Sequence, residues 1–197
     1  MTLERRYNPL NVDELGRNAA RALICYPLSK LPPPDAFQGC GVYTIHYHGT
    51  FPAYTCMGSD EPIYVGKADP PGKRQGRIAT AHNKTTLYGR LTHHARSIDS
   101  AGNLDLADFT CRWLVLDPVW ISLTEQVLIA KYQPLWNVVV DGFGVNDPGK
   151  GRRNQKRSQW DTLHPGRPWA AELADNPSTP DTITATIRHH RPNGESQ

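Results

Sequence analysis

Two short segments, residues 41–48 (GVYTIHYH) and 62–66 (PIYVG), constrain the fold of this chain more than any other feature. Both are rich in Val, Ile and Tyr, and the first alternates along its length, which is typical of β-strands. The residues between them include Gly49-Thr50 and the run 57–60 (MGSD), so we expect a long hairpin connection. A third segment of the same texture, residues 109–116 (FTCRWLVL), predicts another strand.

Helical spacing of apolar residues predicts three helices, over residues 12–26, 87–97 and 119–131. The last begins after Asp117-Pro118, an N-cap followed by proline at the first helical position. It is apolar almost all round, which is typical of a helix buried in the middle of a domain. After it, we expect residues 135–140 (LWNVVV) to be extended.

The length of 197 residues suits one globular domain with loop-rich additions. Pro27 and the run 31–34 (LPPP) end the first helix and form a stiff connector, so this helix is expected to be a packing arm on the main domain. From Lys67 to Thr86 the chain is a long polar loop, and after Asp141 it shows no clear period. The expected divisions are an N-terminal helical arm with a Pro-rich connector (1–38), a catalytic core with an inserted loop at 67–86 (39–140), a basic extension (141–174) and a flexible tail (175–197).

Composition excludes several classes of protein. No apolar run approaches the roughly 18 to 20 residues that span a bilayer, and the N-terminus MTLERRYNPLNVDE has no apolar signal core. We therefore expect a soluble, cytoplasmic protein with no membrane partner. The formal net charge is only +3, but residues 150–157 (KGRRNQKR) hold five basic residues and no acid. No CxxC pair is present, so we expect the four cysteines to be buried or half-buried packing residues: Cys25, Cys40, Cys56 and Cys111.

Glu125 is the most unusual residue of the predicted helices, because it lies on an otherwise apolar face, between Ile121, Ile129 and Tyr132. A carboxylate in such a place needs a cation, a hydrogen-bond network or a proton. Two interpretations follow. Glu125 forms a salt bridge to a nearby Arg, or it is a metal ligand or an acid-base group in a cleft.

Arg90 and His94 are four residues apart and therefore share one face of their helix, which faces inward. Arg presents a planar fork of donors that fits two phosphate oxygens, and His can shuttle a proton near neutral pH. Taken alone, an inward His is more often a core residue with its hydrogen bonds satisfied. Tyr43 and Tyr64 on the predicted strands, and Lys67 just after the second of them, add polar groups, although tyrosines in such positions are usually structural.

Together these residues resemble the GIY-YIG nuclease family. The resemblance rests on Gly41-Val42-Tyr43, Tyr64-Val65-Gly66, an Arg and then a Glu on successive helices, and Asn137, over about residues 39–140. His94 four after the Arg, Asn137 twelve after the Glu, the LPPP connector and the basic KGRRNQKRSQWD segment are similar to the short type II restriction endonucleases that cut the palindrome CCGCGG. The hairpin connection and the 67–86 loop are longer than usual for the family. The resemblance implies an α+β fold, with a small three-stranded antiparallel sheet flanked by helices.

The resemblance also implies Mg²⁺-dependent hydrolysis of double-stranded DNA phosphodiesters, leaving 5′-phosphate and 3′-hydroxyl ends, with Mn²⁺ as a substitute metal. By this analogy Glu125 holds the metal and Arg90 grips the scissile phosphate. Tyr43 accepts the proton of the attacking water, helped by positive charge such as Lys67 or the metal. Tyr64 and His94 orient the water or support Tyr43, and Asn137 holds a neighbouring group or phosphate.

DNA contacts are expected from basic residues in the two polar regions. The 150–157 run neutralises phosphates, and loop arginines read guanines in the major groove, although exposed basic residues are mostly solvated surface. The candidates are Lys73, Arg74, Arg77, Lys150, Arg152, Arg153, Lys156 and Arg157. A palindromic target implies a homodimer, and a restriction enzyme implies a companion DNA methyltransferase in the same cell.

Two other functions remain open from the sequence. A structure-specific or homing-type nuclease would use the same centre, but such enzymes usually carry a separate DNA-binding module for which this chain is short. A catalytically silent nucleic-acid-binding module would keep the fold. The set Tyr43, Tyr64, Arg90 and Glu125 argues against that module, which has no need of a buried carboxylate near phosphate.

Overall fold

The computed structural model describes residues 12–55, 57–58, 60–70, 84–149, 151 and 154–190. Its sheet is antiparallel, with the strand order β1-β4-β2-β3. The strands are β1 (Ser29–Lys30), β2 (Gly41–Tyr47), β3 (Pro62–Ala68) and β4 (Phe109–Val115). β2, β3 and β4 are the three predicted strands, and β1 is a two-residue addition that pairs with Thr110 and Cys111 at one edge. β3 forms the other edge.

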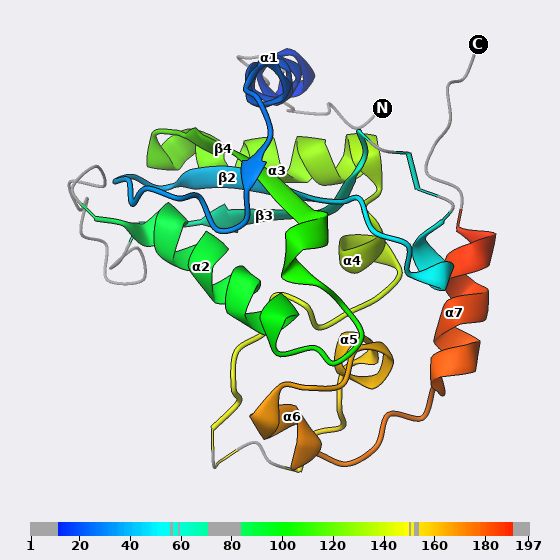
Figure 1. Ribbon diagram of the computed structural model, residues 1–197. Helices are drawn as coiled ribbons and strands as arrows, with labels where there is room; N and C mark the ends of the chain where they lie inside the picture. Colours follow the sequence, from blue (N-terminus) through cyan, green and yellow to red (C-terminus); the bar gives the residue numbers. More distant parts are fainter. Residues whose placement is uncertain are drawn as a thin grey trace, which may run out of the picture.

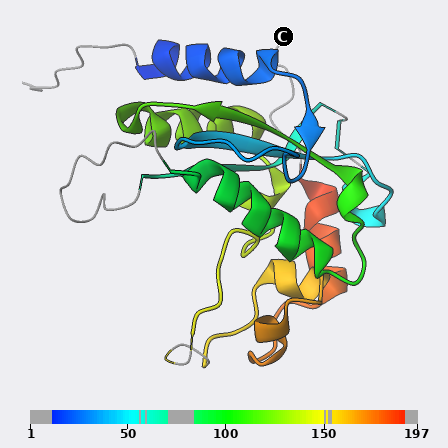
Figure 2. The same cartoon turned by 60° about the vertical axis from the view of Figure 1, so that its left-hand side comes forward.

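Helices cover both faces of this sheet. Figure 1 shows α1 and α3 on one side of it and α2 on the other, and the turned view in Figure 2 agrees. The short helices α5 and α6 lie on the α2 side. The helices are α1 (Val12–Cys25), α2 (Thr86–Asp99), α3 (Pro118–Tyr132), α4 (Leu135–Val138), α5 (Gln159–Leu163), α6 (Pro168–Ala171) and α7 (Pro180–His189), with 3-10 turns η1 (Pro52–Tyr54) and η4 (Leu106–Asp108).

The sheet separates two hydrophobic clusters because successive side chains of a strand point to opposite faces. On the α1/α3 side the buried residues are Ala20, Leu23, Cys40, Val42, Val65, Ile121 and Leu128. The α2 side holds a larger cluster, rich in aromatic rings, that includes Tyr43, Ile45, Leu87, Leu91, Trp136, Phe143 and Trp160. α3 thus lies between α1 and the sheet, but it is less buried than its apolar sequence predicts: Ile121, Thr124 and Leu128 are its buried residues, and Val119 in its first turn is 73% exposed.

Two sequence predictions about local structure are wrong. Residues 135–138 are not extended but form α4, because Pro134 starts a helical turn in which the N–H groups of Asn137 and Val138 donate to its carbonyl, at 2.9 and 3.0 Å. Residues 175–190 are not a flexible tail. They include α7, whose Ile183 and Ile187 pack into the cluster on the α2 side.

The cysteine prediction holds for Cys40 and Cys111, which are buried, whereas Cys25 is exposed and Cys56 lies outside the described residues. Most of the predicted 67–86 loop, residues 71–83, also lies outside them. In the part of the chain that the structure describes, no helix is long and apolar enough to cross a membrane.

Candidate active site

Two tyrosines on neighbouring strands form the centre of the site. In the β2–β3 register Tyr43 pairs with Gly66 and Ile45 with Tyr64, so both tyrosines are on the α2 face of the sheet. Their ring centroids are 6.2 Å apart. A Cβ added to Gly66 would come within 2.3 Å of the Tyr43 hydroxyl. Glycine at this position therefore allows the Tyr43 ring to lie across β3.

α2 brings His94 and Arg90 against these tyrosines. Leu87, Leu91 and His94 are all fully buried, as the helical spacing predicts. His94 Nε2 lies 2.5 Å from the hydroxyl of Tyr43, and the Arg90 guanidinium is close enough to act on both tyrosines. Arg90 is partly exposed, so it can reach a ligand from this position.

Burial controls protonation in this cluster. It raises the pKa of Tyr43 well above its usual value, with Tyr64 adding to the rise and Arg90 opposing it. Burial also raises the pKa of Tyr64, again against the charge of Arg90. For His94, burial and then Arg90 lower the pKa well below its usual value. At neutral pH the imidazole is therefore neutral, and a nitrogen lone pair can accept a proton from Tyr43.

Glu125 and Lys67 form an ion pair at the free edge of β3. Lys67 is opposite Val42 and therefore on the α3 face, where its Nζ lies 2.6 Å from Glu125 Oε2. The two side chains are 30% and 18% exposed. The cation beside Glu125 is thus a lysine, not the arginine that one sequence interpretation expected. The charge that opposes the high pKa of Tyr43 comes from Arg90.

Asn137 holds the strand that carries Tyr64 and Lys67. Its Oδ1 accepts from the Val65 N–H, and its Nδ2 donates to the Val65 carbonyl, both at 2.8 Å. These backbone groups belong to the edge strand, where hydrogen-bonding groups otherwise face outward. Asn137 therefore anchors α4 on β3 and uses both its polar atoms to do so.

The residues present fit a weakly held hard cation. Within the described ranges, no three His, Cys, Asp or Glu side chains come together as a metal cluster. Glu125 instead offers a single carboxylate that reaches solvent. One carboxylate suits Mg²⁺, which keeps several of its waters when bound to protein.

The predicted DNA-contacting residues are only partly described. Lys73, Arg74, Arg77, Lys150, Arg152 and Arg153 lie outside the described residues. Lys156 is exposed on a backbone bridge to Ala174. Arg157 has structural partners, since its Nε donates to the Ala170 carbonyl at 3.1 Å and its Nη2 lies 3.6 Å from Asp175.

The sequence analysis missed a segment that covers the tyrosines, residues 142–146 (GFGVN), which we call the strap. Phe143 stacks on His94 with ring centroids 4.7 Å apart and meets the Tyr64 ring edge-on at 4.9 Å. The Gly144 carbonyl accepts from Arg90 Nη2 at 2.6 Å. The only sequence signal was Phe143 between two glycines, in a region without a clear period.

This arrangement is that of a GIY-YIG nuclease. Two tyrosines lie on adjacent antiparallel strands, and a histidine and an arginine face them from the next helix. A glutamate reaches the sheet edge from the helix after that. A family model described as the Eco29kI GIY-YIG domain matches residues 35–191. The chain therefore belongs to this family of type II restriction endonucleases. No curated protein matches the chain.

Proposed function

We propose that this protein is a Mg²⁺-dependent type II restriction endonuclease that cuts double-stranded DNA at a short GC-rich palindrome, leaving 5′-phosphate and 3′-hydroxyl ends. The observation that best supports it is the 2.5 Å contact between the Tyr43 hydroxyl and His94 Nε2, with Arg90 beside it. Hydrolysis of a phosphodiester needs a proton acceptor next to a group that binds phosphate. A DNA-binding module needs no such acceptor.

The tyrosines and His94 form a path for the proton of the attacking water. Tyr64 is partly exposed, whereas Tyr43 and His94 are fully buried behind it. Burial holds both phenols protonated, so a free phenolate is not the base. Instead the attacking water gives its proton to the tyrosine pair. Tyr43 in turn passes its hydroxyl proton to Nε2 of neutral His94. His94 holds this proton only transiently, because burial and the charge of Arg90 lower its pKa and disfavour the protonated imidazole.

Arg90 binds the scissile phosphate in this proposal. A guanidinium has five N–H donors in a rigid fork. Arg90 Nη2 donates to the Gly144 carbonyl at 2.6 Å, and Nη1 lies 3.5 Å from Asn146 Oδ1. The guanidinium also hydrogen-bonds to the hydroxyls of Tyr43 and Tyr64, so a bidentate contact with phosphate oxygens would replace some of these contacts.

Glu125 would hold the metal ion, with Lys67 next to it. When bound, the ion supplies positive charge that stabilises the leaving 3′-oxygen. Lys67 keeps the Glu125 carboxylate oriented from the adjacent strand, at 2.6 Å. Both groups lie at the free edge of β3, and the Glu125 charge acts on the pKa of both tyrosines.

The proposal includes partners. A two-fold homodimer would give one active site to each strand of a palindrome. Exposed basic side chains such as Lys156 would neutralise phosphates. A DNA methyltransferase with the same target in the same cytoplasm would protect the host genome.

The test is to incubate purified protein with a plasmid of known sequence, in Mg²⁺, in Mn²⁺ and in EDTA, and to sequence the fragment ends. We expect discrete fragments, cut at one short palindrome, only with metal. The matched control is Glu125→Ala, which should bind the same DNA without cutting it, because it loses the metal-holding carboxylate and also a negative charge near phosphate. Wild-type turnover by this variant would refute the metal assignment.

Other products would support other functions. Nicks or smears without fixed ends would identify a structure-specific or homing-type nuclease. Binding without any cleavage, in every metal condition, would leave a nucleic-acid-binding module with a silent centre.

A further inference from the structure

The strap, residues 142–146, touches three of the residues to which we assign chemistry. Phe143 is fully buried and packs on His94 and Tyr64. The Gly144 carbonyl accepts from Arg90, and a Cβ on Gly144 would lie 2.5 Å from the Tyr64 hydroxyl. The strap meets the site through the Phe143 ring, the Gly144 carbonyl and the Asn146 side chain, so a shift of its backbone would move Arg90 and the rings of His94 and Tyr64 together.

Arg167 ties this strap to the C-terminal helices. Its Nη2 donates to the Gly142 carbonyl at 2.9 Å, and its Nη1 donates to the carbonyls of Phe143 and Val145, both at 3.2 Å. Its Nε and Nη2 also donate to the two carboxylate oxygens of Asp161, at 2.6 and 2.7 Å. One guanidinium therefore bonds to three strap carbonyls and to α5.

The rest of the surroundings fix Arg167 in a single orientation. Its guanidinium carbon lies 4.5 Å from the Trp160 ring centroid and 4.8 Å from that of Trp169. Asp161 in turn accepts from Ser158 Oγ at 2.6 Å. The Asp161 and Arg167 side chains are 1% and 4% exposed. Both charges are thus buried with their hydrogen-bonding groups satisfied.

A buried ion pair of this kind is poor evidence for stability, since apolar residues of similar volume often stabilise a fold as well or better. Its distinct property is a fixed geometry. We propose that Asp161 and Arg167 are positioning residues of the active site, which fasten the strap so that it holds Arg90, Tyr64 and His94 in their reactive arrangement. This inference rests on the proposed role of Arg90 in binding the scissile phosphate.

The test uses Arg167→Lys, which keeps the positive charge beside Asp161 but lacks the fork needed to reach three carbonyls. Two quantities are measured: the single-turnover cleavage rate and the NMR signal of the Arg90 side-chain Nε–H, identified by its loss in Arg90→Lys. We expect the rate to fall about ten- to a hundredfold, since misplacement by about 1 Å can cost a hundredfold. The Arg90 signal should change from rigid to mobile.

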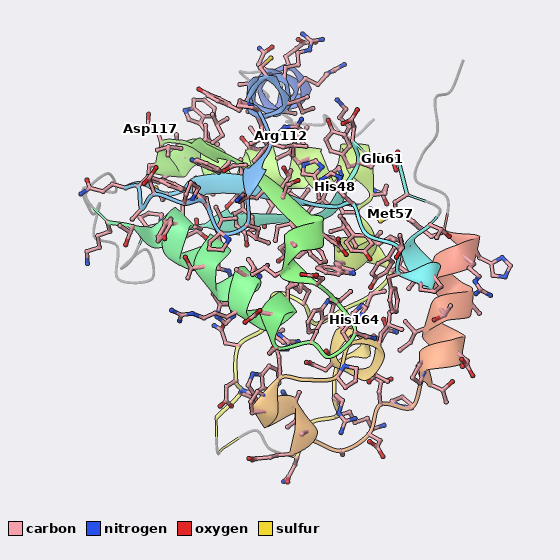
Figure 3. The ribbon with its side chains drawn as sticks, in the orientation of Figure 1. His48, Met57, Glu61, Arg112, Asp117 and His164 are labelled. Atoms are coloured by element: carbon pink, nitrogen blue, oxygen red, sulfur yellow. The ribbon has the colours of Figure 1, made fainter. Side chains whose placement is uncertain are left out.

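The control is Tyr54→Phe, which removes a buried hydroxyl bonded to His164 and Trp136 on the same side of the sheet. Figure 3 shows His164 near α5, and within the described residues no hydrogen bond of Tyr54 reaches the strap. This variant should be less stable but keep both the cleavage rate and the rigid Arg90 signal. If Arg167→Lys does not fold, Asp161→Asn is measured in the same way.

Each outcome decides the proposal. An unchanged rate in Arg167→Lys, or a reduced rate with a rigid Arg90 signal, would overturn it and leave the pair a purely structural role. A wild-type protein that does not cut DNA would refute the proposed function instead. In that case the NMR comparison alone decides whether Arg167 holds Arg90.

Discussion

The two faces of the sheet are built from different kinds of residue. The α1/α3 face is packed by aliphatic side chains such as Leu23, Val42 and Leu128. The α2 face contains Tyr43 and His94, and beyond them the buried Asp161–Arg167 pair. Apolar packing stabilises by burial alone, whereas polar groups in a core must each find a partner. The first face therefore contributes mainly stability, and the second fixes the geometry of chemical groups.

The separation between a stabilising face and a chemical face is not complete, because the site lies along the free edge of β3. Glu125 belongs to α3 and Lys67 points toward that helix, so one ion pair joins the apolar side to the site. An edge strand allows side chains from both faces to meet around it. The comparison thus predicts that substitutions in the α1/α3 cluster change stability and not rate, except at this edge.

Tyr43→Phe should produce the largest effect. It removes one hydroxyl from the proton path, and general acid-base groups contribute about a hundred- to ten-thousandfold. We expect a loss in that range in single-turnover cleavage by folded protein, with a lowered melting temperature because buried His94 loses its hydrogen bond. Tyr47→Phe is the matched control, since Tyr47 is on the same face of β2 and its hydroxyl accepts from the Phe51 N–H at 2.8 Å. More than about a tenth of the normal rate in Tyr43→Phe would remove Tyr43 from the proton path.

Leu23→Ala tests the opposite face. Leu23 is fully buried between α1 and α3, and truncation of such a leucine costs about 2 to 5 kcal/mol. We expect this loss in the free energy of unfolding, measured with urea, and a normal cleavage rate at low temperature. Phe143→Leu is the counterpart on the α2 face and should lose rate as well as stability. If Leu23→Ala also lowered the rate in fully folded protein, the two faces would not be separable.

The response to acid should involve both faces. Burial lowers the pKa of His46, on the α1/α3 face, to about 4, and that of His164, on the α2 side, to about 3. In the unfolded chain each titrates near 6.5, so below pH 6.5 the unfolded state binds more protons and stability falls as pH falls. For His46 the loss runs from pH 6.5 to 4, and for His164 from 6.5 to 3, at about 1.4 kcal/mol per pH unit each.

Urea denaturation at pH 6.5, 5.5 and 4.5 measures the slope of the free energy of unfolding against pH. His46→Gln should reduce it by about 1.4 kcal/mol per pH unit, because that side chain no longer takes up a proton on unfolding. An identical slope in the variant would show that His46 is protonated in the folded protein.

Sequence patterns predicted the elements that have strong periodicity. β2, β3, β4, α2 and α3 all lie within a few residues of their predicted bounds. The errors fall where tertiary contacts outweigh local preference. The run 138–140 (VVV) favours an extended chain. α4 nevertheless forms, because Asn137 makes two hydrogen bonds to the Val65 backbone and Trp136 is buried. α7 was hidden by a polar composition in which Ile183 and Ile187 were its only strongly apolar residues.

The candidate site was predicted as an ordered set of residues, not as a geometry. The resemblance supplied the sequence order of Tyr43, Arg90 and Glu125, but no spacing shows that Lys67 pairs with Glu125 across the edge of the sheet. The strap and Arg167 could not be predicted. Their contacts are between backbone carbonyls and a side chain more than twenty residues away, which leave no periodic pattern.

The smallest expected effect is on the salt dependence of DNA affinity, which reports which face of the sheet the DNA contacts. Lys156 is an exposed cation of the C-terminal extension, and each phosphate contact contributes about 0.9 to the slope of log K against log salt concentration. Lys156→Ala should reduce the slope for specific DNA by about that amount in a fluorescence titration. Arg21→Ala removes an equal charge from exposed α1, across the sheet, and should leave the slope unchanged. A reduced slope in Arg21→Ala would mean that DNA extends over the α1/α3 face, and an unchanged slope in both variants would place the phosphate contacts on other residues.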